Sequence, residues 1–221
     1  MKKIILLLII TLFSANCVFA KGLDMNKFYG KLKNKPTEQE RLAPVKQIYD
    51  EELTPSEKAI LLYGDNNLAA SMDILMTIKE SDRTAMDWLL IGNILQDQNK
   101  ITDAIFMYQR AMSVNPKFYK SYYNLGNIYL EDEKPYLAIQ NYHKVNALNN
   151  NFPYAYYNLG CAYLKIGDLK KAKIAFLKAI ELKNTEPDFH YNLAYIYKML
   201  KNEKLAKQYL GFYNTLMENC Q

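Results

Sequence analysis

The sequence has 221 residues and a net charge of +5 at pH 7, from 28 basic and 23 acidic side chains. So small an excess does not indicate nucleic acid or another strongly charged partner. With two histidines and three cysteines, no His/Cys cluster has the spacing of a zinc site, and no glycine-rich phosphate-binding loop is present. We therefore predict a protein that is not an enzyme and needs no cofactor.

Residues 1–20 have the three parts of a secretory signal peptide. Lys2 and Lys3 precede an apolar run from Ile4 to Phe13, and Ala20 stands before the expected cleavage point. The apolar run has ten residues, whereas a membrane span needs about 20. We expect an exported protein, most simply periplasmic, whose mature charge is 26 minus 23, or +3. An uncleaved membrane anchor and full secretion are the alternatives.

Cys17 offers another way to process the same segment, because bacterial lipoproteins are cut before a cysteine that then receives lipid. The preceding Ser14-Ala15-Asn16 fits that pattern poorly, so lipidation is the less favoured alternative. Residues 21–50 are predicted to form a polar linker. Thr37 and Glu40 have capping-box spacing there, which indicates a possible short helix.

Residues 51–84 contain the signals of two helices. Thr54-Pro55-Ser56-Glu57 predicts the start of the first helix, and Gly64-Asp65 predicts its end. Leu68 to Ile78 is expected to form the second. Because Ala70 lies 34 residues before Ala104, this segment is interpreted as a degenerate copy of the repeat that follows.

From Trp88 to Tyr213 one arrangement of residues recurs every 34 positions. A first small residue recurs at Gly92, Gly126, Gly160 and Ala194. A second, twelve positions later, recurs at Ala104, Ala138, Ala172 and Ala206. Large side chains flank these positions on one helical face at Trp88, Tyr122, Tyr156 and His190, and on another at Tyr108, Tyr142, Phe176 and Leu210.

This pattern predicts pairs of amphipathic helices that approach closely at the small residues, with the rings filling the adjacent hollows. Neither helix of a pair is long enough to be stable alone, so neighbouring pairs must stack. Pro135, Pro153 and Pro187 are expected at helix starts, and Gly167-Asp168 at a turn between helices.

The sequence resembles the tetratricopeptide repeat family in these positions. Its third unit matches the family pattern at Tyr156, Leu159-Gly160, Tyr163, Ala172, Phe176 and Ala179. The resemblance implies an all-α, right-handed superhelical solenoid with repeats at 85–118, 119–152, 153–186 and 187–220. His190, Ala194, Leu210 and Tyr213 depart from the pattern in the last repeat, as expected of a terminal unit.

The resemblance also implies a site, because the first helices of such arrays line a concave groove. The side chains expected to face it are Tyr123, Asn127, Tyr154, Tyr157, Asn158, Tyr191, Asn192 and Tyr195, with Asn93 beside them. Amides can pair with the backbone of an extended peptide while rings bury its side chains. The alternative is that these residues only pack the repeats together.

Arrays of this family that clamp a terminal carboxylate use Lys or Arg together with asparagines. Here the basic positions are occupied by Tyr123, Asp188 and Asn192. Charge-assisted capture of a carboxylate needs the missing cations, so that type of binding is not predicted.

The prediction is therefore a non-enzymatic protein-protein interaction scaffold in the bacterial cell envelope, which binds a peptide segment of an unidentified protein. One alternative is self-association through the uncapped last repeat, where Leu210, Phe212, Tyr213 and Leu216 have no following helix to cover them. Another is an accessory subunit of an envelope assembly or a cell-wall enzyme complex.

Two cysteines remain in the mature chain. Cys161 is expected in the middle of a helix and Cys220 at the end of the last one, which is too far apart for an internal disulfide. Both thiols are predicted to be unpaired within the monomer. A Cys220–Cys220 cross-link between two chains is the alternative.

Overall fold

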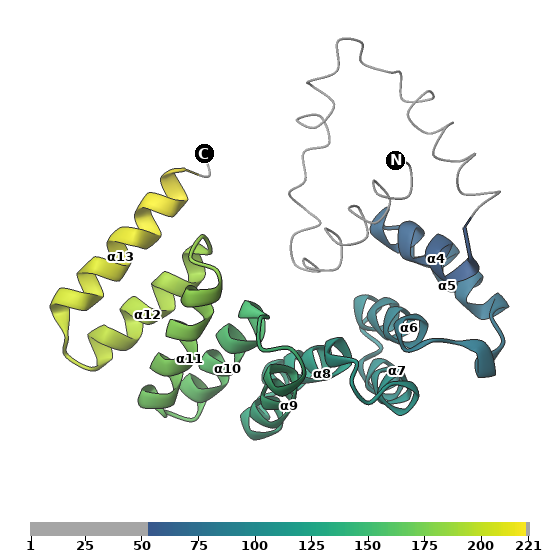
Figure 1. The fold of residues 1–221 in the computed structure, drawn as a ribbon, viewed down its shortest axis with the longest axis horizontal. Helices are drawn as coiled ribbons and strands as arrows, with labels where there is room; N and C mark the ends of the chain where they lie inside the picture. The colour runs from purple at the N-terminus through teal and green to yellow at the C-terminus, as the bar shows by residue number, and fades with distance from the viewer. Residues whose placement is uncertain (1–52, 220–221) are drawn as a thin grey trace, which may run out of the picture. The chain divides into compact units, whose positions relative to one another are not determined.

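The computed structural model describes residues 53–219, which form helices joined by short turns (Figure 1). The predicted signal peptide, the linker, the Cys17 alternative and Cys220 lie outside the described residues. Within 53–219 there is no β-strand, and no helix there is long and apolar enough to cross a membrane. The chain divides into two compact units, one ending at Arg83 and the other beginning at Thr84.

The first unit contains α4 (Pro55–Gly64), α5 (Leu68–Thr77) and a short 3-10 helix, η1 (Glu80–Asp82). At the predicted helix start, Thr54 and Glu57 form a capping box, with the Thr54 amide donating to Glu57 Oε2 at 2.9 Å. Between the helices, the buried Ser71 hydroxyl donates to the Ala59 carbonyl oxygen at 2.7 Å. The predicted helix start and the break after Gly64 are confirmed.

The second unit contains eight helices in four successive pairs, coloured from teal to yellow in Figure 1. Their bounds are α6 (Ala85–Asp97), α7 (Ile101–Val114), α8 (Tyr119–Glu131), α9 (Pro135–Leu148), α10 (Pro153–Lys165), α11 (Leu169–Leu182), α12 (Pro187–Met199) and α13 (Glu203–Glu218). Pro135, Pro153 and Pro187 begin helices, as predicted. The first helices α8, α10 and α12 also pack against the second helix of the preceding pair.

The turn inside each pair contains one residue with positive φ, at the same place in every repeat. These residues are Asn99, Glu133, Gly167 and Lys201, with φ between 54° and 76°. Glycine adopts this left-handed conformation without cost, whereas a residue with a Cβ is destabilised by about 1 kcal/mol or more. Gly167 is therefore the unstrained version of a turn that the other repeats make with ordinary residues.

A glycine beneath a ring sets the distance between the two helices of a pair. A Cβ atom added to Gly92 would lie 2.5 Å from the Tyr108 ring, and one added to Gly160 would lie 2.7 Å from the Phe176 ring. Gly126 faces Tyr142 in the same way, at 2.6 Å. These separations are too short for any side chain, which confirms the predicted role of the small residues and the rings.

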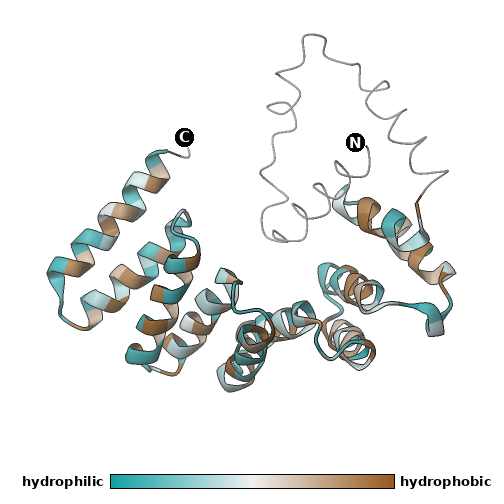
Figure 2. Cartoon of the chain, viewed as in Figure 1, coloured by the Kyte–Doolittle hydropathy of each residue, from teal (hydrophilic) through white to brown (hydrophobic). Residues whose placement is uncertain are grey.

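The core runs continuously from one repeat to the next. Tyr142 and Phe176, both fully buried, belong to one cluster that also contains Leu159, Leu193 and Ile196 from the first helices. A smaller cluster joins Tyr108 to Leu125 and Ile128 in the same manner. Figure 2 shows that hydrophobic and hydrophilic residues alternate along α12 and α13, as amphipathic helices require.

The glycine-ring contact predicts that the effect of Gly160→Ala on stability depends on the ring opposite. Gly160→Ala should lower the free energy of unfolding by about 1 to 3 kcal/mol, because the new methyl group collides with Phe176. In a Phe176→Leu background the same change should be neutral or stabilising by up to about 1 kcal/mol, because alanine favours the helix. The last repeat already combines Ala194 with Leu210.

Urea unfolding of the four proteins in this cycle measures the coupling. An equal penalty for Gly160→Ala in both backgrounds would show that the ring does not set the helix separation.

Candidate partner-binding surface

The eight predicted site residues lie on the first helices of three successive repeats, and we call them the Tyr/Asn surface. Tyr123 and Asn127 come from α8, Tyr154, Tyr157 and Asn158 from α10, and Tyr191, Asn192 and Tyr195 from α12. Six of them are half-buried. Tyr191 and Tyr195 are 50% and 47% exposed.

Asn127 joins two repeats through its side-chain oxygen. The hydroxyl of Tyr142, a fully buried ring, donates to Asn127 Oδ1 at 2.8 Å. Asn158 Nδ2, from the next repeat, donates to the same oxygen at 2.8 Å and to the Tyr123 hydroxyl at 3.2 Å. A buried phenol needs a hydrogen-bond partner, so Asn127 has a structural role that the sequence did not predict.

The preceding repeat contains the same junction. The Tyr108 hydroxyl lies 2.9 Å from Asn93 Oδ1 and 2.8 Å from Gln96 Oε1, and its single proton serves one of these oxygens at a time. Asn124 Nδ2 donates to Asn93 Oδ1 at 2.7 Å. The oxygen of Asn93, a residue predicted to face the groove, is thus used within the array. Asn124 was not among the predicted site residues, although it stands 34 positions before Asn158.

In the third repeat the junction changes with the ring. Phe176 has no hydroxyl to satisfy, and Cys161 takes the place of the accepting asparagine. Asn192 Nδ2 donates to the Tyr157 hydroxyl instead, at 2.8 Å. Each first helix from α8 onward is therefore linked to the one before it by an asparagine side chain.

Ring contacts run along the same surface through two residues that the sequence analysis missed. The Phe152 ring centroid lies 4.9 Å from that of Tyr123 and 5.9 Å from that of Tyr154. The Phe189 ring stacks on Tyr157 at 4.7 Å and meets Tyr154 at 5.9 Å. Phe152 and Phe189 thus connect Tyr123, Tyr154 and Tyr157 into one aromatic row.

The Tyr154 hydroxyl belongs to a small charged group at the start of α12. It lies 2.9 Å from Glu186 Oε1 and accepts from Lys183 Nζ at 2.7 Å. Lys183 and Glu186 also form an ion pair. The pKa of Tyr154 is raised, mainly by burial. The contact with Lys183 lowers this pKa, and the contact with Glu186 raises it. The cation nearest to this tyrosine is therefore already neutralised by a carboxylate.

Burial disfavours the charged forms of two tyrosines and one cysteine at or beneath this surface. Burial is the main cause that raises the pKa of both Tyr142 and Tyr157. Burial also raises the pKa of the Cys161 thiol to about 11. A thiol with so high a pKa stays protonated at neutral pH and is a poor nucleophile. Cys161 is free, as predicted.

His190 has the predicted core position. It is buried, its Nε2 lies 2.8 Å from the Asn184 carbonyl oxygen, and its ring lies 5.5 Å from that of Phe212. Within residues 53–219 no group of histidine, cysteine and acidic side chains could hold a metal ion.

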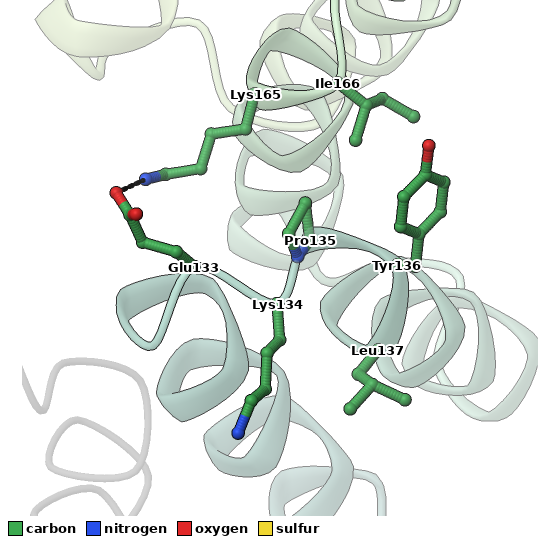
Figure 3. A pocket seen from close by; sticks show the side chains of 7 residues that line it. All are labelled: Glu133, Lys134, Pro135, Tyr136, Leu137, Lys165 and Ile166. Carbon is green, nitrogen blue, oxygen red and sulfur yellow. Dashed lines mark ion pairs between the residues drawn. The ribbon is translucent and has the colours of Figure 1, made fainter.

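A shallow pocket lies away from the Tyr/Asn surface, where the turn after α8 meets the end of α10 (Figure 3). Its lining comprises Glu133, Lys134, Pro135, Tyr136, Leu137, Lys165 and Ile166. Lys165 and Glu133 form an ion pair at 3.6 Å across one edge. Both side chains are largely exposed, so this pocket contains no buried polar group that would fix a small ligand.

The hydrogen bonds on the Tyr/Asn surface leave two amide ends without a hydrogen-bond partner among the described residues. Asn127 uses its oxygen twice and keeps its Nδ2 hydrogens, whereas Asn158 uses its Nδ2 twice and keeps its oxygen. One asparagine therefore presents donors and the other an acceptor. Because the junction fixes both side chains, the two groups are oriented before any ligand arrives.

Comparisons with known proteins establish the family. A family model described as tetratricopeptide repeat matches residues 119–152, 153–186 and 187–211, and a second described as TPR repeat matches 92–132. The matches extend from residue 92 to 211, which is 120 of the 221 residues. The chain belongs to the tetratricopeptide repeat family. No curated protein matches it.

Solved structures show the same fold. A structure named MamA MSR-1 C2 is 20% identical, with a TM-score of 0.62, and the match covers 80% of this chain and 99% of that one. Another, named MamA 41-end from Desulfovibrio magneticus RS-1, is 19% identical, with a TM-score of 0.66 and coverage of 75% and 94%. The predicted all-α, right-handed superhelical solenoid is confirmed. Such repeat arrays present extended surfaces to other proteins, so the chain is a protein-protein interaction scaffold by family.

The asparagine links predict unequal effects of removing two tyrosine hydroxyls. Tyr157→Phe should lower the free energy of unfolding by about 1 kcal/mol, because Asn192 Nδ2 loses its acceptor in a half-buried place. Tyr195→Phe, a matched change on an exposed ring, should alter stability by less than about 0.5 kcal/mol. Thermal unfolding of both variants measures the difference, and equal effects would rule out a stabilising Asn192 link.

Proposed function

We propose that the Tyr/Asn surface binds an extended segment of another protein, and that the scaffold works in the bacterial cell envelope. The observation that carries this proposal is the pair of oriented amide ends on Asn127 and Asn158. A peptide backbone offers one acceptor and one donor per residue. A carbonyl oxygen of the segment would accept from Asn127 Nδ2, and an N–H group would donate to Asn158 Oδ1.

The exposed rings supply the apolar part of the same interaction. Tyr191 and Tyr195 expose about half of their surface, and tyrosine gives a large contact area at a low cost in side-chain entropy. Both rings follow Asn158 in the direction of the array. A segment held by the two amides would therefore continue onto these rings and bury apolar side chains against them.

The chemistry of the surface favours an uncharged stretch of the partner. Lys183 is paired with Glu186 beside Tyr154, and Asp188 and Asn192 occupy places where carboxylate-binding arrays have cations. Capture of a free carboxylate would lack charge-assisted hydrogen bonds. We therefore propose an internal segment of the partner as the ligand rather than its C-terminus.

The proposed location rests on residues 1–20, whose sequence has the three parts of a signal peptide. In the cell envelope the scaffold would act as an accessory subunit of a larger assembly. Determining the N-terminal residue of the protein recovered from its own cells tests this directly. Lys21 at the N-terminus supports export by signal cleavage, lipid-modified Cys17 supports an anchored form, and an intact Met1 in the cytoplasm contradicts the proposal.

The role of the Asn127 amide can be tested without disturbing the array. Asn127→Asp keeps the oxygen that accepts from Tyr142 and Asn158, and replaces only the free donor by a second oxygen. Peptides selected from a display library against the unmodified protein should bind this variant about 10-fold more weakly or worse. Gln140→Glu, which adds the same charge at an exposed position on α9, is the matched control.

Isothermal titration calorimetry with the selected peptides gives the affinities of the unmodified protein, Asn127→Asp and Gln140→Glu. The proposal is contradicted if Asn127→Asp binds the selected peptides as tightly as the unmodified protein, or if Gln140→Glu weakens binding to the same extent.

A further inference from the structure

Within the described residues, the last repeat leaves exposed a surface that each of the three preceding repeats packs against the next first helix. We call it the open end, and it consists of Tyr191 and Tyr195 on α12 with Leu210 and Tyr213 on α13. Leu210 is 42% exposed, whereas the residues at its position in the three preceding repeats, Tyr108, Tyr142 and Phe176, are fully buried. No described helix follows α13 to cover it.

The earlier repeats show what covers such a surface. Leu125 and Ile128 of α8 lie in one core cluster with Tyr108 of the preceding repeat. Leu193 and Ile196 of α12 lie in the other, together with Phe176. In each case the first helix of the following repeat presents a leucine and, three residues later, a second apolar residue to the ring.

A polar contact accompanies the apolar one at every junction. The residue directly before the covering leucine is an asparagine, namely Asn124, Asn158 or Asn192. Each donates its Nδ2 to an oxygen of the preceding first helix, and for Asn192 that oxygen is the Tyr157 hydroxyl. Tyr191 stands 34 residues after Tyr157. By position in the repeat, its hydroxyl is therefore the counterpart of the oxygen that accepts from Asn192.

We propose that the open end binds an amphipathic helix of a partner protein that carries Asn-Leu followed three residues later by another apolar residue. Its asparagine would donate to the Tyr191 hydroxyl, and its leucine and second apolar residue would cover Leu210 and Tyr213. This site takes a helix, whereas the segment-binding site proposed above takes an extended chain. The two sites share Tyr191 and Tyr195, but this proposal does not depend on Asn127 or Asn158.

The chain's own described helices do not offer this combination. The Asn-Leu faces of α8, α10 and α12 are already used within the array. In α6, Leu90 occupies the position of the asparagine, so that helix lacks the donor. Asn67-Leu68 is at the start of α5, where the Asn67 side chain caps the helix by accepting from the Ala70 amide at 3.3 Å. A helix from a different protein therefore fits the open end better than a second copy of this chain.

A stapled peptide with the sequence of α12, residues 187–199, is the probe, because the staple forms the helix before binding. It contains Phe189, Asn192-Leu193 and Ile196 in the required spacing. Fluorescence anisotropy with the full-length protein should show saturable binding. Tyr191→Phe in the protein and Asn192→Ala in the peptide should each weaken binding roughly 5-fold, the effect of one hydrogen bond.

Tyr191→Phe in the protein and Asn192→Ala in the peptide should together weaken binding no more than either change alone, because both remove the same contact. Tyr136→Phe, on a ring that is 68% exposed outside the open end, should have no effect. Asn127→Asp should also leave this binding intact, which separates the site from the proposed segment-binding one.

Three results would overturn the proposal. They are no saturable binding of the stapled peptide, additive effects of Tyr191→Phe and Asn192→Ala, and a dimer of the full-length protein in light scattering that Leu210→Lys dissociates. The last result would identify a second copy as the occupant.

Discussion

The contact between a glycine of the first helix and a ring of the second is the constraint on which the array depends. It brings the backbones so close that a Cβ atom at Gly126 would lie 2.6 Å from the Tyr142 ring. At that separation the phenol hydroxyl reaches across the first helix to Asn127. The same oxygen then accepts from Asn158 of the next repeat, so a packing requirement inside one hairpin determines how two hairpins are joined.

The proposed binding surface follows from this arrangement. The amides that tie the repeats together are held by hydrogen bonds on one side, which orients their remaining groups. Preorganised polar groups bind with a smaller entropy cost than mobile ones. Under the proposed function, the same asparagine side chains serve both stability and recognition. A substitution that preserves the internal oxygen, such as Asn127→Asp, separates the two roles.

Most of the fold could be predicted from the sequence, because its period and its small residues reflect contacts within a single hairpin. Gly92, Gly126 and Gly160 recur with their rings at a fixed spacing, and Pro153 and Pro187 mark helix starts. Glu133 and Lys201 could not be recognised as left-handed turn residues, since neither residue type prefers that conformation.

The site was predicted less completely, because its hydrogen bonds cross between repeats. A signal was nevertheless present: asparagine accompanies tyrosine in the first two repeats, at Asn93 with Tyr108 and Asn127 with Tyr142, whereas Cys161 accompanies Phe176 in the third. Phe152 and Phe189 lie outside the family pattern, and only the stacking of the helices brings them against the tyrosines.

Nuclear magnetic resonance of the asparagine side-chain amides, during titration with a peptide selected for binding, tests the central claim most directly. The account predicts that the Asn127 Nδ2 signal shifts in proportion to the bound fraction. The Asn141 signal, whose Nδ2 donates to the Leu137 carbonyl oxygen on α9, should stay in place. Saturable binding with no change at Asn127, or with an equal change at Asn141, would contradict the proposed use of the Tyr/Asn surface.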